Sequence, residues 1–367
     1  MKNILTADAL AFFEQYINTS SPSGFESAGQ KVWSDYLRPY VDTLEMDNYG
    51  NTWGVINPDA EYKVVIEAHA DEIGWAVKYI DDKGLLYLCQ VGGADTEILP
   101  SRRMVVHTRD GKQHDGVVAW PAIHIRSKDK PSKIKAELGQ VFVDIGAKNK
   151  EEVENMGIHA GCLVTHPDPF TTVGDYFVGR AMDNRAGGFM IAQVARLLQE
   201  NKKKLPFGLY IVNAVQEEVG VHGAAMVARK LQPDVAIVTD VNHCTTTPGI
   251  DNKKHGSIKS GDGPTVMYGP TVHQKLVDIV TDTAKKNKIP YQTEMRSRGG
   301  WNVSGTDTDA FAYHSNGGVA CLLSLPLRYM HTPSEMIHKS DVKNTIQLMY
   351  ETLLALNPAT DYRYLAL

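Results

Sequence analysis

The chain has 367 residues, of which 43% are hydrophobic and 22% are charged, and its formal net charge is −5. A chain of this length can bury a large core, in one large domain or in two ordinary ones. The modest negative charge and the lack of a long basic run argue against a nucleic-acid partner. No apolar stretch approaches the length of a membrane span, so no membrane partner is expected either.

The N-terminus and the cysteines indicate the compartment. Residues 1–20 contain acidic side chains and no uninterrupted apolar core, which favours an amphipathic helix over a signal peptide. The four cysteines are dispersed and form no CxxC pair, which argues against a disulfide framework and against a cysteine zinc site. The sequence therefore predicts a reducing, cytoplasmic setting.

Along the chain, the first elements are a helix and a strand, and a β-rich module follows them. Residues 7–18 have the apolar spacing of a helix, and residues 63–69 have the composition of a buried strand. From about residue 72 to 166, short β-like segments are separated by glycine-containing turns. This pattern favours a compact β-barrel or sandwich over βαβ units. The polar segment 125–137 is expected to be an exposed loop of that module.

After residue 170, predicted strands alternate with predicted helices. The strands are expected at 207–215, 234–240 and 318–324, and the helices at 185–200, 223–231, 273–286 and 341–356. Such alternation predicts an α/β sandwich with a largely parallel core. The simplest architecture is an α/β domain, formed by residues 1–71 and 167–367, that is interrupted by an inserted β domain at 72–166.

Histidines and carboxylates follow several of the apolar strands at their carboxyl ends, where an open α/β sheet collects its functional groups. These residues are His69, Asp71, Glu217, Glu218, Asp240 and His331. Asp183 directly precedes a helix, where the N-terminal amides favour a carboxylate. Each residue alone has an ordinary explanation, such as a helix cap, a hydrogen-bonded histidine or a solvated edge. Their joint occurrence after apolar runs favours a functional site.

A hydrolase with two metal ions requires this inventory of side chains. Two divalent ions need a bridging carboxylate and further histidine or carboxylate ligands, and another carboxylate must stay unligated to move a proton. Adjacent residues of an extended chain point to opposite sides, so one of Glu217 and Glu218 can bind a metal while the other faces the water. Asp71 projects the same way as His69 and can orient its ring.

Several motifs resemble those of one known family. They are IEAHADEIGWAV, GRAMDNRAGG, VQEEVGVHGAA, VTDVNHCTTTPG and LPLRYMHTPSEM in this order, with SSPSGFE near the N-terminus and SGTDTDAF at 304–311. Together they resemble the M42 metallo-aminopeptidases, the group of glutamyl and tetrahedral aminopeptidases, from about residue 7 to 355. The resemblance implies an α/β/α catalytic domain of the zinc-peptidase type with a small inserted β-barrel domain for oligomerisation and substrate access.

The resemblance also implies a metal centre. Asp183 would bridge two divalent ions, Glu218 and His331 would complete one site, and His69 and Asp240 would complete the other. Zinc is the first candidate, and cobalt and manganese suit the same mixture of ligands.

The implied reaction is removal of N-terminal residues from short peptides. Glu217 would be the general base, and Asp71 would be the acid beside the histidine ligand. Relatives form dimers that assemble into hollow dodecamers, so a homo-oligomer is expected. Two departures, Asn184 after the bridging residue and the segment 296–307, bear on specificity and assembly more than on catalysis.

Two other functions remain open at the level of the sequence. The same metal chemistry could serve a carboxypeptidase or an amide deacylase, and a non-catalytic assembly or binding protein could have the same fold. The sequence leaves the preferred first residue, the physiological metal and the choice between dimer and dodecamer open.

Overall fold

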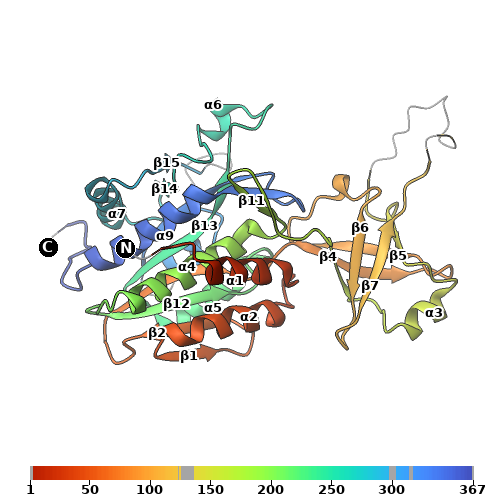
Figure 1. The fold of residues 1–367 in the computed structure, drawn as a ribbon, viewed down its shortest axis with the longest axis horizontal. Helices are drawn as coiled ribbons and strands as arrows, with labels where there is room; N and C mark the ends of the chain where they lie inside the picture. Colours follow the sequence, from red (N-terminus) through yellow and green to blue (C-terminus); the bar gives the residue numbers. More distant parts are fainter. Residues whose placement is uncertain (1–2, 123, 125–135, 297–302, 314–316, 366–367) are drawn as a thin grey trace.

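The computed structural model describes residues 3–122, 124, 136–296, 303–313 and 317–365. It has an α/β body and a β-barrel that projects from one end of it, and the two termini lie on the side away from the barrel (Figure 1). Most of the predicted loop at 125–137 and the centre of segment 296–307 lie outside the described residues. The predicted α/β class with an inserted barrel is confirmed.

The body contains one large mixed sheet. Within the described residues its strand order is β1-β2-β12-β3-β13-β16-β17-β11-β10, with β14 and β15 beside β16. The central strands β12, β3, β13 and β16 are parallel, as the sequence predicts. Their bounds are Gly208–Ala214, Lys63–His69, Val235–His243 and Val319–Arg328. Helices cover both faces of this parallel core, which explains why these strands are near-continuous apolar runs.

The edges of the sheet are short strands that the sequence analysis does not predict. On one edge lie β1 (Thr43–Met46) and β2 (Thr52–Ile56). The other strands are β17 (Glu335–His338), β11 (Tyr176–Gly179), β10 (Thr171–Val173), β14 (Thr265–Met267) and β15 (Gln292–Glu294). Several of these strands are partly or fully exposed, so they lack the apolar pattern that marks a buried strand.

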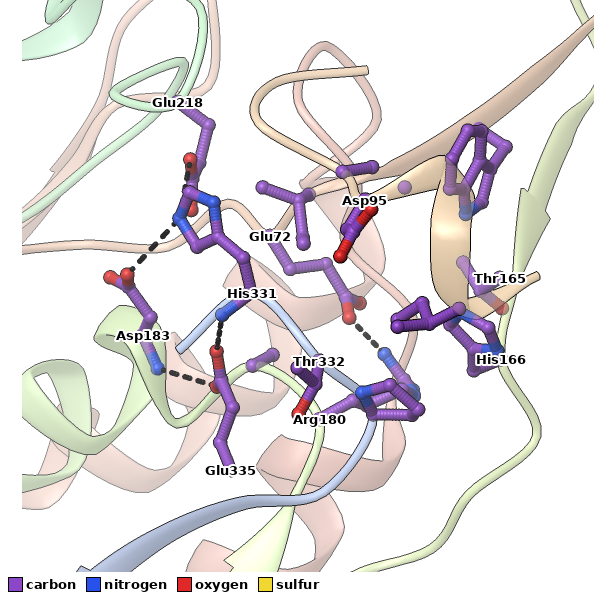
Figure 2. Close-up of a pocket in the computed structure, with 17 residues that line it drawn as sticks. Glu72, Asp95, Thr165, His166, Arg180, Asp183, Glu218, His331, Thr332 and Glu335 are labelled. Atoms are coloured by element: carbon purple, nitrogen blue, oxygen red, sulfur yellow. Dashed lines mark hydrogen bonds and ion pairs between the residues drawn. The ribbon is translucent and has the colours of Figure 1, made fainter. Parts of the chain in front are cut away.

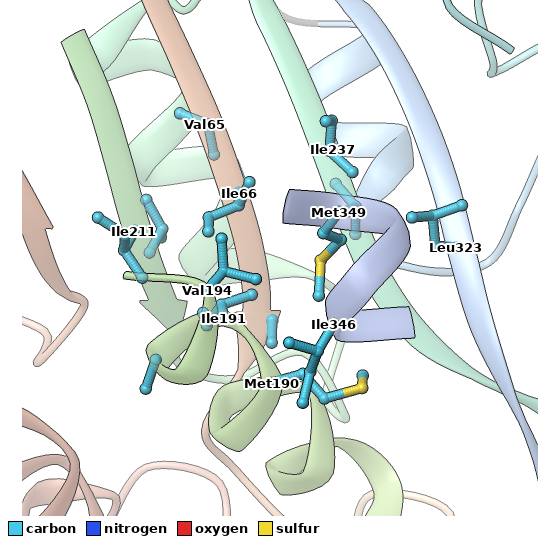
Figure 3. Packing of buried hydrophobic residues seen from close by; sticks show 14 of the residues in the cluster. Val65, Ile66, Met190, Ile191, Val194, Ile211, Ile237, Leu323, Ile346 and Met349 are labelled. Carbon is cyan, nitrogen blue, oxygen red and sulfur yellow. The ribbon is translucent and has the colours of Figure 1, made fainter. Parts of the chain in front are cut away.

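Two helices, α4 (Met182–Glu200) and α9 (Lys339–Ala355), pack against one face of the sheet. Ile191 and Val194 of α4 and Ile346 of α9 meet Ile66 and other apolar side chains of the strands (Figure 3). The helices α1 (Ala7–Asn18) and α2 (Ser27–Leu37) pack on α4, and α7 (Gln274–Asn287) packs beside α9. On the other face lie α5 (His222–Leu231) and α8 (Thr308–Ala312). The short α6 (Asn252–His255) and a 3-10 turn, η1 (Arg38–Tyr40), complete the body.

The projecting module is a closed barrel. Of the two architectures that the sequence left open for it, the barrel is therefore confirmed and the sandwich is wrong. Its strand order is β4-β5-β8-β7-β6-β9. The bounds are Gly74–Ile80, Leu86–Val91, Phe142–Asp144, Gln113–Val118, Arg103–His107 and Leu163–Thr165. A separate apolar cluster that includes Trp75, Val106 and Val143 fills it. The turn η2 (Thr96–Ile98) and the helix α3 (Lys150–Asn155) belong to the same module, and its boundaries at 72 and 166 stay a prediction.

We expect Ile66→Ala to destabilise the body by about 2–5 kcal/mol, because it leaves a cavity between β3 and α4 at a side chain with no exposed area. Val173→Ala on the exposed strand β10 is the control and should change the free energy of unfolding by less than about 0.5 kcal/mol. Denaturant unfolding of both variants tests this, and equal effects would contradict the packing described here.

Candidate active site

Asp183 lies at the centre of the candidate site. Its Oδ1 atom is 3.2 Å from Nε2 of His69, and its Oδ2 atom is 3.4 Å from Nε2 of His331. Figure 2 shows the carboxylate facing the ring of His331. The first turn of α4 is not helical at Asp183 and Asn184, and Ala181 before it has a left-handed backbone. This local geometry directs the Asp183 side chain to the carboxyl edge of the sheet instead of along the helix.

Two groups of possible metal ligands share Asp183. One group contains Asp183, His69 and Asp240, and the other contains Asp183, Glu218 and His331. In each group the ligand atoms lie within 4.8 Å of one another. The structure therefore brings together all five residues that the resemblance implies as ligands.

Glu217 and Glu218 do not lie in an extended strand, so the expected reason for their opposite orientation is wrong. Strand β12 ends at Ala214, and Gln216 has a positive φ of 58°, which begins a turn. The two side chains nevertheless face different histidines. Oε2 of Glu217 is 3.9 Å from Nε2 of His69, and Oε2 of Glu218 is 3.5 Å from Nε2 of His331. Glu217, Glu218 and His69 also form a third possible ligand group.

Asp71 anchors this turn. Its carboxylate accepts hydrogen bonds from the backbone amides of Glu217 at 3.0 Å and Glu218 at 3.1 Å, and from Oγ of Ser23 at 2.6 Å. One oxygen also lies 3.3 Å from Nδ1 of His69, so the position beside the histidine ring is the expected one. Burial alone would raise the pKa of Asp71, but the interactions with His69 and Ser23 lower it, so the residue remains a carboxylate. The sequence analysis gives no role to Ser23, although it lies in the SSPSGFE motif.

Glu335 is another residue of the site that the sequence analysis does not identify. Its carboxylate accepts hydrogen bonds from the backbone amides of His331 at 2.7 Å and Asp183 at 3.1 Å (Figure 2). It therefore fixes the two backbone segments that carry these side chains. The only signal in the sequence is its place in the LPLRYMHTPSEM motif.

The remaining expectations concern Asp240 and Asn184. Asp240 lies inside β13, which continues to His243, so the strand does not end at Asp240 as predicted. Asn184 donates to the carbonyl oxygen of Thr239 at 2.6 Å and accepts from the amide of Gly187 at 3.2 Å. Its amide group connects α4 to β13 and is no part of the two ligand groups.

The electrostatics of the site fit divalent cations. Burial raises the pKa of Glu217 to about 9 and that of Asp240 to about 6, and neighbouring carboxylates add to both shifts. Burial and the charge of Asp183 raise the pKa of Glu218 well above its usual range, and Oε1 of Glu218 is buried without a hydrogen-bond donor. Burial opposes ionisation of Asp183 as well, but hydrogen bonds with His331 and His69 lower its pKa. Buried carboxylates at this density need compensating positive charge, which oxygen- and nitrogen-binding dications supply.

A pocket opens beside this centre, between the body and the barrel. Asp183, Glu218 and His331 form part of its wall (Figure 2). On another side it is lined by the ion pair between Arg180 and Glu72. Apolar side chains of the barrel complete the lining, namely Trp75, Ala94 and Ile98. The pocket therefore combines an apolar surface with direct access to the ligand groups.

The fold is that of the zinc-peptidase type, and the two groups of possible metal ligands lie at the carboxyl edge of its sheet. A model of the M42 glutamyl aminopeptidase family matches residues 50–348. The lysyl aminopeptidase of Pyrococcus furiosus is 31% identical over 94% of this chain and 96% of its own. The TET aminopeptidase of a marine sediment archaeon, Thaumarchaeota archaeon SCGC AB-539-E09, is 29% identical with a TM-score of 0.87, over 94% of this chain and 96% of its own. PhTET1-12s, whose structure is a dodecamer, is 25% identical with a TM-score of 0.80, over 95% of this chain and 98% of its own.

The chain belongs to the M42 family of aminopeptidases and is a peptide hydrolase. This excludes the non-catalytic alternative, and membership of a metallopeptidase family implies divalent metal ions. Within the residues that the structure describes, no helix is long and apolar enough to cross a membrane.

Glu26 bonds the backbone of the turn that carries Glu217 and Glu218, and its titration should make the free energy of unfolding depend on pH. Its carboxyl is buried, accepts the amides of Gly24 at 2.7 Å and Gln216 at 3.2 Å, and burial raises its pKa from 4.5 to about 7. The folded state therefore holds a proton that the unfolded state has released, and stability is lost as the pH rises from about 4.5 to 7.

Glu26→Gln removes this proton while keeping the oxygen acceptor. Relative to the wild type, we expect the variant to gain stability as the pH rises through that window, by at most about 3 kcal/mol. Denaturant unfolding in a chelator, so that metal release does not contribute, measures this. Glu45→Gln on exposed β1 is the control, and a Glu26→Gln curve parallel to the wild type would contradict the assignment.

Proposed function

We propose that the protein is an aminopeptidase that removes N-terminal residues from short peptides with two divalent ions held in common by Asp183. The observation that carries this proposal is the position of Asp183, whose two oxygens face His69 and His331 separately. A carboxylate with one oxygen directed to each of two ligand groups has the geometry of a bridging ligand.

The two groups supply the other proposed ligands. His69 and Asp240 would bind one ion, and Glu218 and His331 would bind the other. Zinc is the first candidate because the ligands mix imidazole nitrogen and carboxylate oxygen, and cobalt and manganese accept the same set. When bound, the ions supply Lewis acidity, which lowers the pKa of a water molecule and polarises the scissile carbonyl.

Glu217 is the proposed general base. Its carboxylate is directed to the shared centre but is farther from the nearest histidine than the carboxylate of Glu218 is. Divalent ions held by the adjacent ligand groups would lower the raised pKa of Glu217 toward the working pH. Glu217 would then take a proton from the attacking water and return it to the leaving amine.

Asp71 acts through the groups that it positions. It would keep Nδ1 of His69 protonated, so that Nε2 carries the lone pair for a metal. Through the amides of Glu217 and Glu218 it would also hold the base and one ligand in a fixed relation to that histidine.

The specificity for the peptide N-terminus is part of the proposal. A free α-amine would bind an ion or the nearby carboxylates, and the adjacent pocket would receive the first side chain. A carboxypeptidase or an amide deacylase would use the same centre but would not require the amine. Substrates blocked at either end distinguish these functions.

The first test is hydrolysis of aminoacyl-p-nitroanilides and their N-acetylated counterparts by metal-free protein reloaded with zinc, cobalt or manganese. We expect metal-dependent cleavage of the free-amine substrates, no cleavage of the acetylated ones, and a preference that identifies the first residue. Cleavage of acetylated substrates at the same rate would contradict the aminopeptidase proposal.

Glu217→Gln should lower kcat by about 10²–10⁴-fold, because it removes the base, while both ions remain bound. Glu61→Gln is the matched control, since Glu61 is exposed and lies before the opposite end of β3. Metal content measured beside the kinetics separates the two roles of Glu217. A large loss of metal in Glu217→Gln would make Glu217 a ligand instead of the base.

The barrel is the proposed oligomerisation module, and the proposed assembly is a homo-oligomer of dimers. The dodecameric structure of PhTET1-12s supports a dodecamer for this chain. Sedimentation velocity on the metal-loaded protein should show a particle of twelve 40.5-kDa chains, or the dimer from which it is built. A monomer at micromolar concentration would contradict this proposal.

A further inference from the structure

A turn of the barrel reaches the proposed metal centre. Strand β5 ends at Val91, and the next two residues, Gly92 and Gly93, lie against the loops of the α/β body. The carbonyl oxygen of Gly93 is 3.0 Å from Nδ1 of His331. The same segment continues into Ala94 and η2, which line the pocket.

This contact determines the tautomer of His331. A carbonyl oxygen only accepts hydrogen bonds, so Nδ1 must carry the proton and donate it to Gly93. The lone pair of the neutral ring is then on Nε2, the atom that faces Asp183 at 3.4 Å and Glu218 at 3.5 Å. Metal-binding histidines are commonly oriented by a partner of this kind at their other ring nitrogen.

A side chain at this turn would press on its neighbours. A Cβ atom at Gly93 would lie 2.6 Å from Nδ1 of His331 and 2.7 Å from its Cε1, well inside contact distance. At Gly92, φ is +65° and a Cβ atom would lie 3.0 Å from Cγ2 of Ile73 and 3.1 Å from Cβ of Glu218. Both glycines therefore lie against side chains that are proposed ligands of the same ion.

The backbone of His331 is fixed as well, and this limits where its ring can lie. The amide of His331 donates to Oε1 of Glu335 at 2.7 Å, and the residue itself has a positive φ of 61°. A ring displaced by a side chain at position 93 could not keep both this backbone position and its distance to Asp183.

We propose that Gly93 is a positioning residue for His331, so that the barrel completes the metal site formed by Asp183, Glu218 and His331. This inference rests on the proposed function, because it assigns His331 as a ligand. The inference goes beyond the proposed function because it makes the position of the barrel a condition for the binding of one of the two ions. His69 and Asp240, which would hold the other ion, make no contact with Gly92 or Gly93 among the interactions described.

The first test is metal binding by the Gly93→Ala variant. Stepwise titration of metal-free protein with Co²⁺ in the presence of a competing chelator, followed by cobalt absorption, should show one ion bound as in the wild type. The other should bind about 10–100-fold more weakly. Gly269→Ala is the control, because a Cβ there meets only the flexible end of Met267, and it should leave both affinities unchanged. Unchanged affinity for both ions in Gly93→Ala would overturn the proposal.

A double-mutant cycle on metal-free protein tests the contact without any ion. Gly93→Ala should lower the melting temperature in the wild-type background but not in a His331→Ala background, where the ring is absent. If Gly93→Ala alone does not fold, recovery of folding in the double variant supports the same contact. An equal loss in both backgrounds would overturn the proposal.

The two experiments separate failure of this inference from failure of the proposed function. Wild-type protein that binds fewer than two ions would contradict the two-metal function, and the cycle would still decide whether Gly93 positions His331. Two ions in the wild type with no coupling between Gly93 and His331 would leave the function intact and overturn the inference alone.

Discussion

Repulsion among buried carboxylates is the constraint on which the site depends. Asp183, Glu217, Glu218 and Asp240 converge at one edge of the sheet, and burial opposes the ionisation of all four carboxyls. The pKa is raised at Glu217, Glu218 and Asp240, whereas hydrogen bonds with His331 and His69 lower it at Asp183. Two imidazoles and backbone amides offset only part of this charge. The fold stabilises the arrangement through its parallel core, because β12, β3 and β13 end at the same edge and bring residues that are distant in sequence together.

Buried carboxylates around the proposed ligands fix their orientation. Asp71 holds the ring of His69 and the turn of Glu217, while Glu335 holds the backbones of His331 and Asp183. These partners are themselves buried, so they have few alternative positions. In the proposed reaction this rigidity keeps the base, the ligands and the pocket in fixed relative positions. Such positions matter because small displacements of catalytic groups greatly lower the reaction rate.

The sequence contained enough information to predict the α/β class and which side chains gather at the candidate site, for a physical reason. His69 directly follows a buried apolar run, and such runs in parallel strands end at a common edge. The turn at Gln216, with its positive φ, could not be predicted in this way, because its hydrogen-bond partners Glu26 and Asp71 come from distant parts of the chain. Glu335 and Gly93 were missed since they reach the site from β17 and the barrel, whose position relative to the body is a tertiary property.

The central claim is that one carboxylate is shared by two ions. A crystal structure of the cobalt-loaded protein with an anomalous difference map tests it most directly. Two peaks should flank Asp183, each about 2.0–2.2 Å from a carboxylate oxygen of Asp183, with one also bound by His69 and the other by His331. A single peak, or two peaks that do not share Asp183, would contradict the account.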